Sequence, residues 1–130
     1  MPAFTKVLFI DDDIITISIY ERMLKFTSFA GEFVAKRDGE QAKEYLMTNM
    51  AALPDIIFVD LYMTIMNGPE FLQWFEQWSK AENIEIPVYV LSSSLSQDDF
   101  EQATAFKVNG YIVKPMTVEH LNEISAKYAV

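Results

Sequence analysis

The sequence predicts an α/β fold, a doubly wound sheet of five parallel strands with helices on both faces. Short apolar runs alternate five times with longer amphipathic segments. The runs are too short for helices and rich in β-branched residues, which is typical of strands buried on both faces. Such alternation implies right-handed crossovers, with helices on either side of the sheet. No linker or further repeat interrupts the 130 residues, so we expect one domain over residues 1–130.

The first half of the chain provides two strands and two helices. Residues 6–10 form the first strand, and an amphipathic helix follows over residues 14–29. Its pattern rests on four apolar residues at helical spacing: Ile15, Ile19, Met23 and Phe26. Residues 32–36 are a weaker strand candidate, and a helix runs from Asp38 to about residue 52. We expect its buried stripe to comprise Ala42, Tyr45, Leu46 and Met50.

The third strand is the most clearly marked. Residues 56–59 are all apolar, and Asp60 ends the run at the rim of the sheet. We expect Asn67 and Gly68 to turn the loop that follows, because both residue types tolerate positive φ. Pro69 suits the first turn of the next helix, where its missing N–H has no partner to lose.

An aromatic-rich helix follows Pro69 and extends to about residue 82, and the fourth strand covers residues 86–91. The buried stripe of this helix comprises Phe71, Leu72, Phe75 and Trp78. Ser96 and Asp99 form a capping pair for a helix that ends near residue 107.

The end of the chain provides the last strand and helix. Asn109-Gly110 turns the chain into the fifth strand, residues 111–113, and Thr117 caps the final helix. One side of this helix is apolar and comprises Val118, Leu121, Ile124 and Tyr128.

The composition limits the possible functions. A hydrophobic fraction of 51% supports a packed core, and a net charge of −9 argues against direct binding to nucleic acid or insertion at an anionic membrane. The absence of cysteine excludes disulfides, thiol catalysis and thiolate metal sites. No apolar run approaches a membrane span and the N-terminus lacks the features of a signal peptide, so we expect a cytoplasmic protein.

Polar residues follow the strands at one edge of this sheet. The carboxyl ends of four strands carry acidic, hydroxyl and amino side chains: Asp11, Asp12, Asp60, Ser92 and Lys114. Each has a structural explanation alone, as a helix start, a turn or a solvated charge. Ligands of doubly wound sheets bind outside the carboxyl ends of the strands, so the coincidence of these residues at one edge indicates a site.

The chemistry of this set suits a phosphoryl acceptor. Three close carboxylates repel one another unless a cation joins them, and Mg²⁺ prefers one or two carboxylates plus a phosphate. With the charge neutralised, one carboxylate can act as a nucleophile towards a phosphoryl group. Lys114 and Ser92 can bind the phosphoryl oxygens.

Four motifs occur in order and on the expected elements. They are residues 9–12, the strand at 54–60 with residues 66–68 beyond it, residues 91–92, and residues 111–115. With these motifs the whole chain resembles the receiver domain of the response regulators of bacterial two-component systems, of the stand-alone, chemotaxis-regulator-like kind. The resemblance implies a flavodoxin-like sheet of order 2-1-3-4-5.

The resemblance also implies a role for each site residue. Asp60 would take a phosphoryl group from a phosphohistidine of a sensor histidine kinase or histidine phosphotransfer protein, in a Mg²⁺-dependent step of a phosphorelay. The metal ligands it implies are Asp11, acting through water, Asp12, Asp60 and the backbone carbonyl of Tyr62. Ser92 would turn towards the phosphoryl group, Tyr111 would move inward behind it, and the Lys114–Pro115 bond would be cis.

The implied output is a change of surface. Phosphorylation would reshape the face made by the fourth helix, fifth strand and fifth helix, which an unknown downstream protein would read. Such a domain is not an enzyme for other substrates and catalyses only its own phosphorylation and slow dephosphorylation. We hypothesise that the bulk of Tyr62 slows the entry of the hydrolytic water. His120 is interpreted as exposed or capping, and Trp74 and Trp78 as packing residues or a partner surface.

Two other functions stay open. A haloacid-dehalogenase-type phosphatase also forms an aspartyl phosphate and begins with Asp-x-Asp, as residues 11–13 do, although Ile15 stands where threonine is usual. The alternative is a phosphorylation-independent protein-interaction module with the receiver fold, whose usual sign, loss of a site residue, is missing here. No output domain follows the last helix, so we expect a stand-alone regulator, a relay intermediate or a receiver cut from a longer protein.

Overall fold

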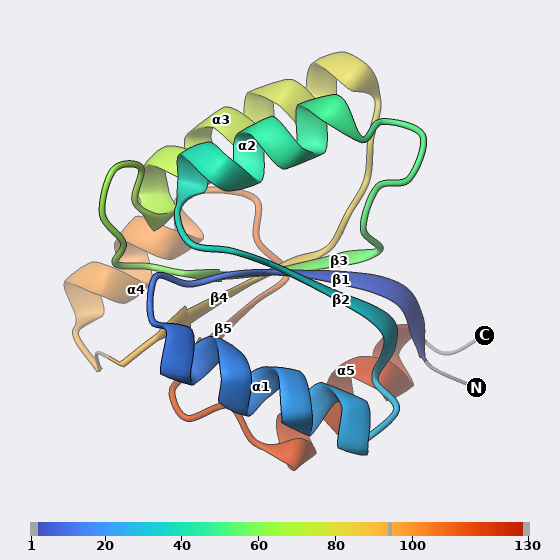
Figure 1. Cartoon of the computed structure of the whole chain (residues 1–130). Coiled ribbons are helices and arrows are strands. Elements are labelled where there is room, and N and C mark those ends of the chain that lie inside the picture. The colour runs from blue at the N-terminus through green and yellow to red at the C-terminus, as the bar shows by residue number, and fades with distance from the viewer. Residues whose placement is uncertain (1–2, 94, 129–130) are drawn as a thin grey trace.

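The computed structural model describes residues 3–93 and 95–128 and has three layers, with a sheet between two layers of helices (Figure 1). The parallel sheet has the order β2-β1-β3-β4-β5, which confirms the predicted fold class and strand order. Its strands are β1 (Phe4–Ile10), β2 (Ala30–Lys36), β3 (Ile56–Asp60), β4 (Val88–Ser92) and β5 (Gly110–Val113).

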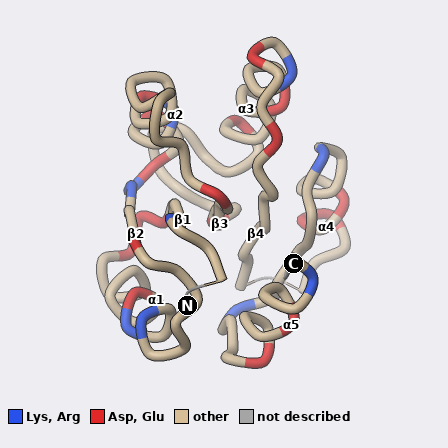
Figure 2. Tube along the Cα trace, turned by 90° about the vertical axis from the view of Figure 1, so that its right-hand side faces the viewer, with Lys and Arg blue, Asp and Glu red and all other residues tan. Residues whose placement is uncertain are grey.

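A helix follows each strand. The helices are α1 (Ile14–Phe26), α2 (Gly39–Thr48), α3 (Gly68–Glu82), α4 (Gln97–Thr104) and α5 (Val118–Tyr128). Figure 2 shows α2 and α3 on one face of the sheet and α1 and α5 on the other. The short helix α4 contacts α3 and β5. Over the described residues, no helix combines the length and apolar character needed to cross a membrane.

The core consists of two apolar clusters, one on each face of the sheet. Successive residues of a strand point to opposite faces, so Phe58 joins the cluster under α1 and α5 while Ile57 and Val59 join the cluster under α2 and α3. Every residue of β3 is therefore buried. This explains the uninterrupted apolar run before Asp60, and it fixes the backbone that carries this carboxylate.

Capping residues define where the helices begin. The side chain of Asp38 accepts a hydrogen bond from the N–H of Gln41 at 2.8 Å. Asn67 and Glu70 form a reciprocal capping box at the start of α3. The predicted cap of α4 is confirmed, since the hydroxyl of Ser96 accepts from the N–H of Asp99.

The end of the chain shows a similar cap. The Thr117 N–H donates to Nδ1 of His120 at 2.9 Å, and the His120 N–H donates to the Thr117 hydroxyl at 3.3 Å. The capping interpretation of His120 is therefore confirmed.

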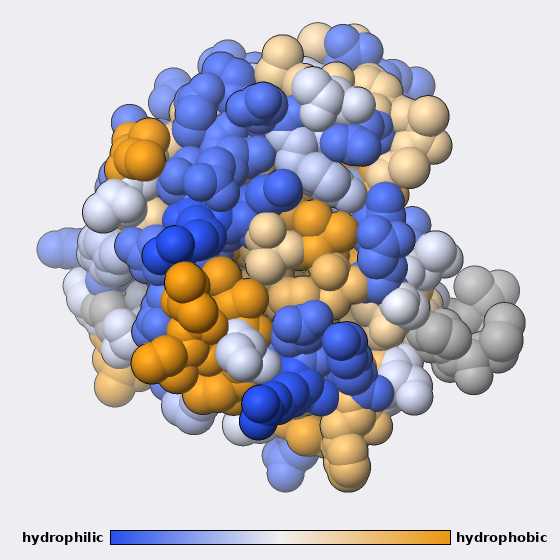
Figure 3. All heavy atoms as spheres, in the orientation of Figure 1, coloured by the Kyte–Doolittle hydropathy of each residue, from blue (hydrophilic) through white to orange (hydrophobic). Residues whose placement is uncertain are grey.

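Of the four apolar residues that mark the expected stripe of α1, Met23 packs against the core and the other three are exposed. The buried residues of the helix are Tyr20 and Leu24, whereas Ile15, Ile19 and Phe26 are 71%, 54% and 88% exposed. The helix carries apolar residues on more than one side, so their spacing alone cannot select the face that packs on the sheet. Figure 3 shows apolar atoms gathered over the N-terminal half of α1.

Several helices end at other residues than the sequence predicts. The first helix ends at Phe26 rather than residue 29, and Ser28 then turns the chain with a φ of 55°. The second helix ends at Thr48, which leaves Met50 outside it and exposed. The fourth helix stops at Thr104 rather than near residue 107. Val118 begins the last helix but is 40% exposed, so it lies at the margin of the expected stripe.

The role expected for Asn67 and Gly68 is wrong as well. Asn67 has a φ of −80°, and no glycine in the described residues has a positive φ. The positive φ in this loop belongs to Ile65, at 66°.

Further along α3, Trp74 and Trp78 are half-buried and stack with ring centroids 5.0 Å apart, which agrees with the packing interpretation.

Candidate phosphoacceptor site

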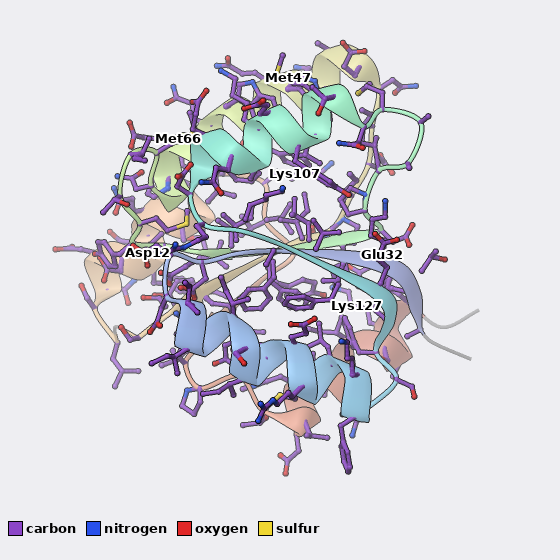
Figure 4. All side chains as sticks on the ribbon, viewed as in Figure 1. Asp12, Glu32, Met47, Met66, Lys107 and Lys127 are labelled. Atoms are coloured by element: carbon purple, nitrogen blue, oxygen red, sulfur yellow. The ribbon has the colours of Figure 1, made fainter. Side chains whose placement is uncertain are left out.

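Three carboxylates meet at the carboxyl edge of the sheet. Asp11 and Asp12 follow β1 and Asp60 ends β3, and these strands are neighbours in the sheet. One carboxylate oxygen from each lies within 4.8 Å of the others. Asp11 and Asp60 are buried and Asp12 is half-buried. Figure 4 labels Asp12 at this edge of the sheet.

Lys114 joins this cluster from the end of β5. Its Nζ atom lies 2.9 Å from Oδ2 of Asp11 and 3.1 Å from Oδ1 of Asp60. The backbone N–H of Lys114 donates to the carbonyl of Ser92 at 2.8 Å, so the segment is held beside β4. The Lys114–Pro115 bond is cis, as expected.

The electrostatics of the cluster are unbalanced. Burial, followed by the charge of Asp11, raises the pKa of Asp60 to about 6, although Lys114 acts in the opposite direction. Burial acts to lower the pKa of Lys114, but its hydrogen bond to Asp11 and the charge of Asp60 outweigh burial and raise that pKa. One lysine therefore does not neutralise three carboxylates. Hard oxygen ligands with excess negative charge fit a divalent cation, so the residues present suit a metal site.

Ser92 lies on β4, the strand beside Asp60, and Tyr111 lies on β5, one strand further away. Ser92 is fully buried at the end of β4, where Leu91 is the register partner of Asp60. Tyr111 is half-buried in β5, and its ring meets the ring of Phe100 edge-on at 5.3 Å. Ser92 thus lies at the same edge of the sheet as the carboxylates, whereas Tyr111 lies two residues further back along β5, in register with Val90.

The side chain of Tyr62 does not remain free in the loop after β3. It is more than half exposed, yet its hydroxyl donates a hydrogen bond to Oδ1 of Asp99 in α4. This hydrogen bond, together with partial burial, raises the pKa of Tyr62. The loop that follows Asp60 is therefore connected to α4 by a polar contact that the sequence did not predict.

Gly68 supports the site for a reason that sequence reasoning missed. Its N–H donates to the carbonyl of Leu61 at 3.0 Å. A Cβ atom at this position would lie 2.7 Å from both the Asp60 carbonyl oxygen and the Leu61 Cα. Only glycine permits this approach, so the close contact between α3 and the end of β3 is the structural role of Gly68.

Arg37 is a second residue that sequence reasoning missed. It follows β2, and its guanidinium donates to the backbone carbonyl of Asp12 at 3.3 Å. The sequence could have indicated this residue, because Arg37 follows β2 directly and therefore lies at the same edge of the sheet as the aspartates. Asp13, in contrast, is not part of the carboxylate cluster, because its side chain caps α1 by accepting from the N–H of Ile15.

Known proteins resemble this chain in both sequence and structure. A family model described as response regulator receiver domain matches residues 7–126. The probable methanogenesis regulatory protein FilR2 of Methanothrix harundinacea is 31% identical over 119 residues, which cover 88% of this chain and 75% of that protein. The chain spans 46% to 51% of the length of transcriptional regulatory proteins that it also matches.

Two solved structures of response regulators also have folds similar to that of this chain. A two component response regulator from Cytophaga hutchinsonii has a TM-score of 0.86 and 32% identity, with 96% of each chain covered. The phosphorylated cyanobacterial phytochrome response regulator RcpA has a TM-score of 0.76 and 30% identity, with 95% of this chain and 89% of that chain covered.

Proposed function

The chain belongs to the response regulator receiver domain family, and on that premise we propose that Asp60 is the residue that accepts the phosphoryl group. Domains of this family are phosphoacceptors in two-component signal transduction. The observation that carries the assignment is the position of the Asp60 carboxylate, buried at the end of β3 between two further aspartates and Lys114.

In the proposed reaction, a carboxylate oxygen of Asp60 attacks the phosphorus of a phosphohistidine. The new oxygen–phosphorus bond forms as the nitrogen–phosphorus bond breaks, and the electron pair of that bond returns to the imidazole. Lys114, whose ammonium lies 3.1 Å from Asp60, is placed to bind a phosphoryl oxygen. Ser92 supplies a hydroxyl at the end of the neighbouring strand.

Receiver domains bind a divalent metal at an acidic pocket, and we propose that the ion here is Mg²⁺. The ligands would be Asp11 through water, Asp12, Asp60 and the carbonyl of Tyr62. When bound, the ion supplies positive charge that reduces the repulsion between the carboxylates and the phosphoryl oxygens. The chain itself contributes the three carboxylates, which lie within reach of one ion.

The proposed partners follow from the same chemistry. The donor is a sensor histidine kinase or a histidine phosphotransfer protein, and a downstream protein reads the face formed by α4, β5 and α5. Tyr111 lies on β5 within this face and is the proposed switch residue. We also propose that the domain acts on no separate substrate and catalyses only its own phosphorylation and slow dephosphorylation.

The test is phosphorylation by a small donor. Wild type incubated with acetyl phosphate and Mg²⁺ is expected to gain one phosphoryl group, roughly 80 Da, in intact mass. Asp60→Ala is expected to gain none, while Asp98→Ala, which removes an exposed carboxylate of α4, gains the same mass as wild type. A modified Asp60→Ala would show that another residue is the acceptor. No gain by folded wild type would favour the phosphorylation-independent interaction module.

A further inference from the structure

Two adjacent residues of α4 contact tyrosines from other segments of the site. Asp99 accepts a hydrogen bond from the hydroxyl of Tyr62, which lies two residues after Asp60. Phe100 packs edge-on against the ring of Tyr111, with centroids 5.3 Å apart and planes at 76°. The first turn of α4 is thus joined both to the loop that follows the proposed acceptor and to β5.

The helix α4 has little apolar anchoring of its own. It contains eight residues, and its buried residues are Asp99 and Ala103. A helix of this length is unstable in isolation and depends on tertiary contacts. Since one of its two buried side chains is a carboxylate, the polar contact of Asp99 contributes to holding the helix in place.

The hydrogen bond joins a buried carboxylate to a phenol that is partly open to solvent. Asp99 is 9% exposed, whereas Tyr62 is 56% exposed. Hydrogen bonds to ionised acceptors are stronger than those between neutral groups. The two residues are 37 positions apart in the chain, so the bond joins segments that local structure does not connect.

We propose that the Tyr62–Asp99 hydrogen bond is a tether through which the loop after Asp60 holds α4, so that a change at Asp60 is passed to α4 through Tyr62. The second half of this inference rests on the proposed function, because it requires that Asp60 be phosphorylated. Tyr62 acts here as a positioning residue for α4. Coupling of this kind requires a contact whose state both segments influence, and this bond is such a contact.

The test is amide hydrogen exchange over residues 97–104, measured without a phosphodonor and then with acetyl phosphate and Mg²⁺. Without a donor, Tyr62→Phe and Asp99→Ala are each expected to speed exchange in α4 by roughly tenfold, since a hydrogen bond to a charged group is lost. The double variant should exchange no faster than Asp99→Ala, because Asp99→Ala already lacks the bond that Tyr62→Phe removes. Tyr45→Phe, a matched change on α2, should leave α4 unaffected.

The donor arm tests transmission. In wild type, phosphorylation is expected to change exchange in α4, and in Asp99→Ala, which lacks the tether but keeps every site residue, that change should be largely lost although the variant still gains the phosphoryl mass. Unchanged α4 exchange in Tyr62→Phe, or effects that add in the double variant, would overturn the tether. A full response of α4 to phosphorylation in Asp99→Ala would overturn transmission through the Tyr62–Asp99 bond. Failure of wild type to gain mass would instead count against the proposed function. In that case the exchange measured without a phosphodonor would still test whether the Tyr62–Asp99 bond holds α4.

Discussion

Lys114 places its ammonium 3.1 Å from a carboxylate oxygen of Asp60, although β5 and β3 are separated in the sheet by β4. Lys114 spans this gap because it follows β5 directly and is anchored to β4 by the hydrogen bond between its N–H and the Ser92 carbonyl. The lysine is shared with Asp11, and the edge of the sheet therefore retains excess negative charge. This imbalance leads to the first three predictions.

Asp60 should destabilise the metal-free protein at neutral pH. Its pKa is raised from 3.8 to about 6 on folding, so the folded state binds more protons than the unfolded state between these values. The free energy of unfolding is therefore expected to fall as the pH rises through this window. Asp60→Asn should be more stable than wild type at pH 7 by at most about 3 kcal/mol, with no advantage below pH 4.

Urea unfolding in EDTA at several pH values measures this difference. Glu123→Gln, which neutralises an exposed carboxylate of α5, is the control and should shift stability little at any pH. A wild type more stable than Asp60→Asn at pH 7 would contradict the prediction.

Removal of the Lys114 ammonium should be costly. Lys114→Met leaves the buried carboxylates of Asp11 and Asp60 without their cation, and we expect a loss of roughly 3 kcal/mol of unfolding free energy at pH 7. The loss should shrink as the pH falls towards 4, because Asp60 then becomes neutral. Phosphorylation by acetyl phosphate should also slow.

Lys25 provides the comparison for this variant. Its ion pair with Glu21 lies on the surface of α1, with side chains 69% and 40% exposed, so Lys25→Met should change stability by less than about 1 kcal/mol. Equal effects of the two substitutions would show that the position of Lys114 in the site is not what matters.

Mg²⁺ should stabilise the protein through the carboxylate cluster. Binding to the folded state raises the unfolding free energy by about 2.7 kcal/mol when the free ion is at 100 times its dissociation constant. The melting temperature of wild type should therefore rise with Mg²⁺ and return when EDTA is added. Asp12→Asn should lose most of this response.

Asp13→Asn is the matched control for the metal experiment. It removes the same charge one residue further on, and asparagine can replace aspartate as the N-cap of α1. This variant should keep the stabilisation by Mg²⁺. If both variants lose the response equally, general electrostatic attraction rather than the cluster accounts for it.

Substitution of Gly68 should disturb both stability and the site. The Cβ atom in Gly68→Ala would meet the backbone of Asp60 and Leu61 at 2.7 Å, and backbone atoms cannot move aside easily. We expect a loss of about 1–3 kcal/mol in urea unfolding and slower phosphorylation. Gly31→Ala, at an exposed position of β2, should be neutral or slightly stabilising.

The position of the site was predictable because of the way parallel sheets are built. Asp60 and Lys114 each follow an apolar run directly, and parallel strands bring such positions to one edge. The 3.1 Å contact between them confirms that inference about placement, while the chemical role of each residue stays a prediction. The strand order also followed from the resemblance to known receivers.

Other features could not be read from the sequence for physical reasons. The periodicity of α1 indicates a helix but not its buried face, because apolar residues lie on more than one side of the helix. The buried face is the one that carries Tyr20, whose ring packs against Phe9 of β1 with centroids 5.3 Å apart. The contact of Tyr62 with Asp99 depends on where α4 lies, which no local pattern specifies. Gly68 was correctly marked as special, but the reason was a backbone approach that only three-dimensional structure reveals.

The stacked pair Trp74 and Trp78 determines which part of the protein tryptophan fluorescence and near-ultraviolet circular dichroism monitor. Both tryptophans of the chain lie on α3, with ring planes 18° apart, and Lys43 of α2 lies 5.7 Å from the Trp74 ring. Indole emission and near-ultraviolet dichroism will therefore follow the packing of α3 on α2 and give a clear unfolding signal. The face formed by α4, β5 and α5 contains no indole in the described residues, so a fluorophore must be added there to follow signalling.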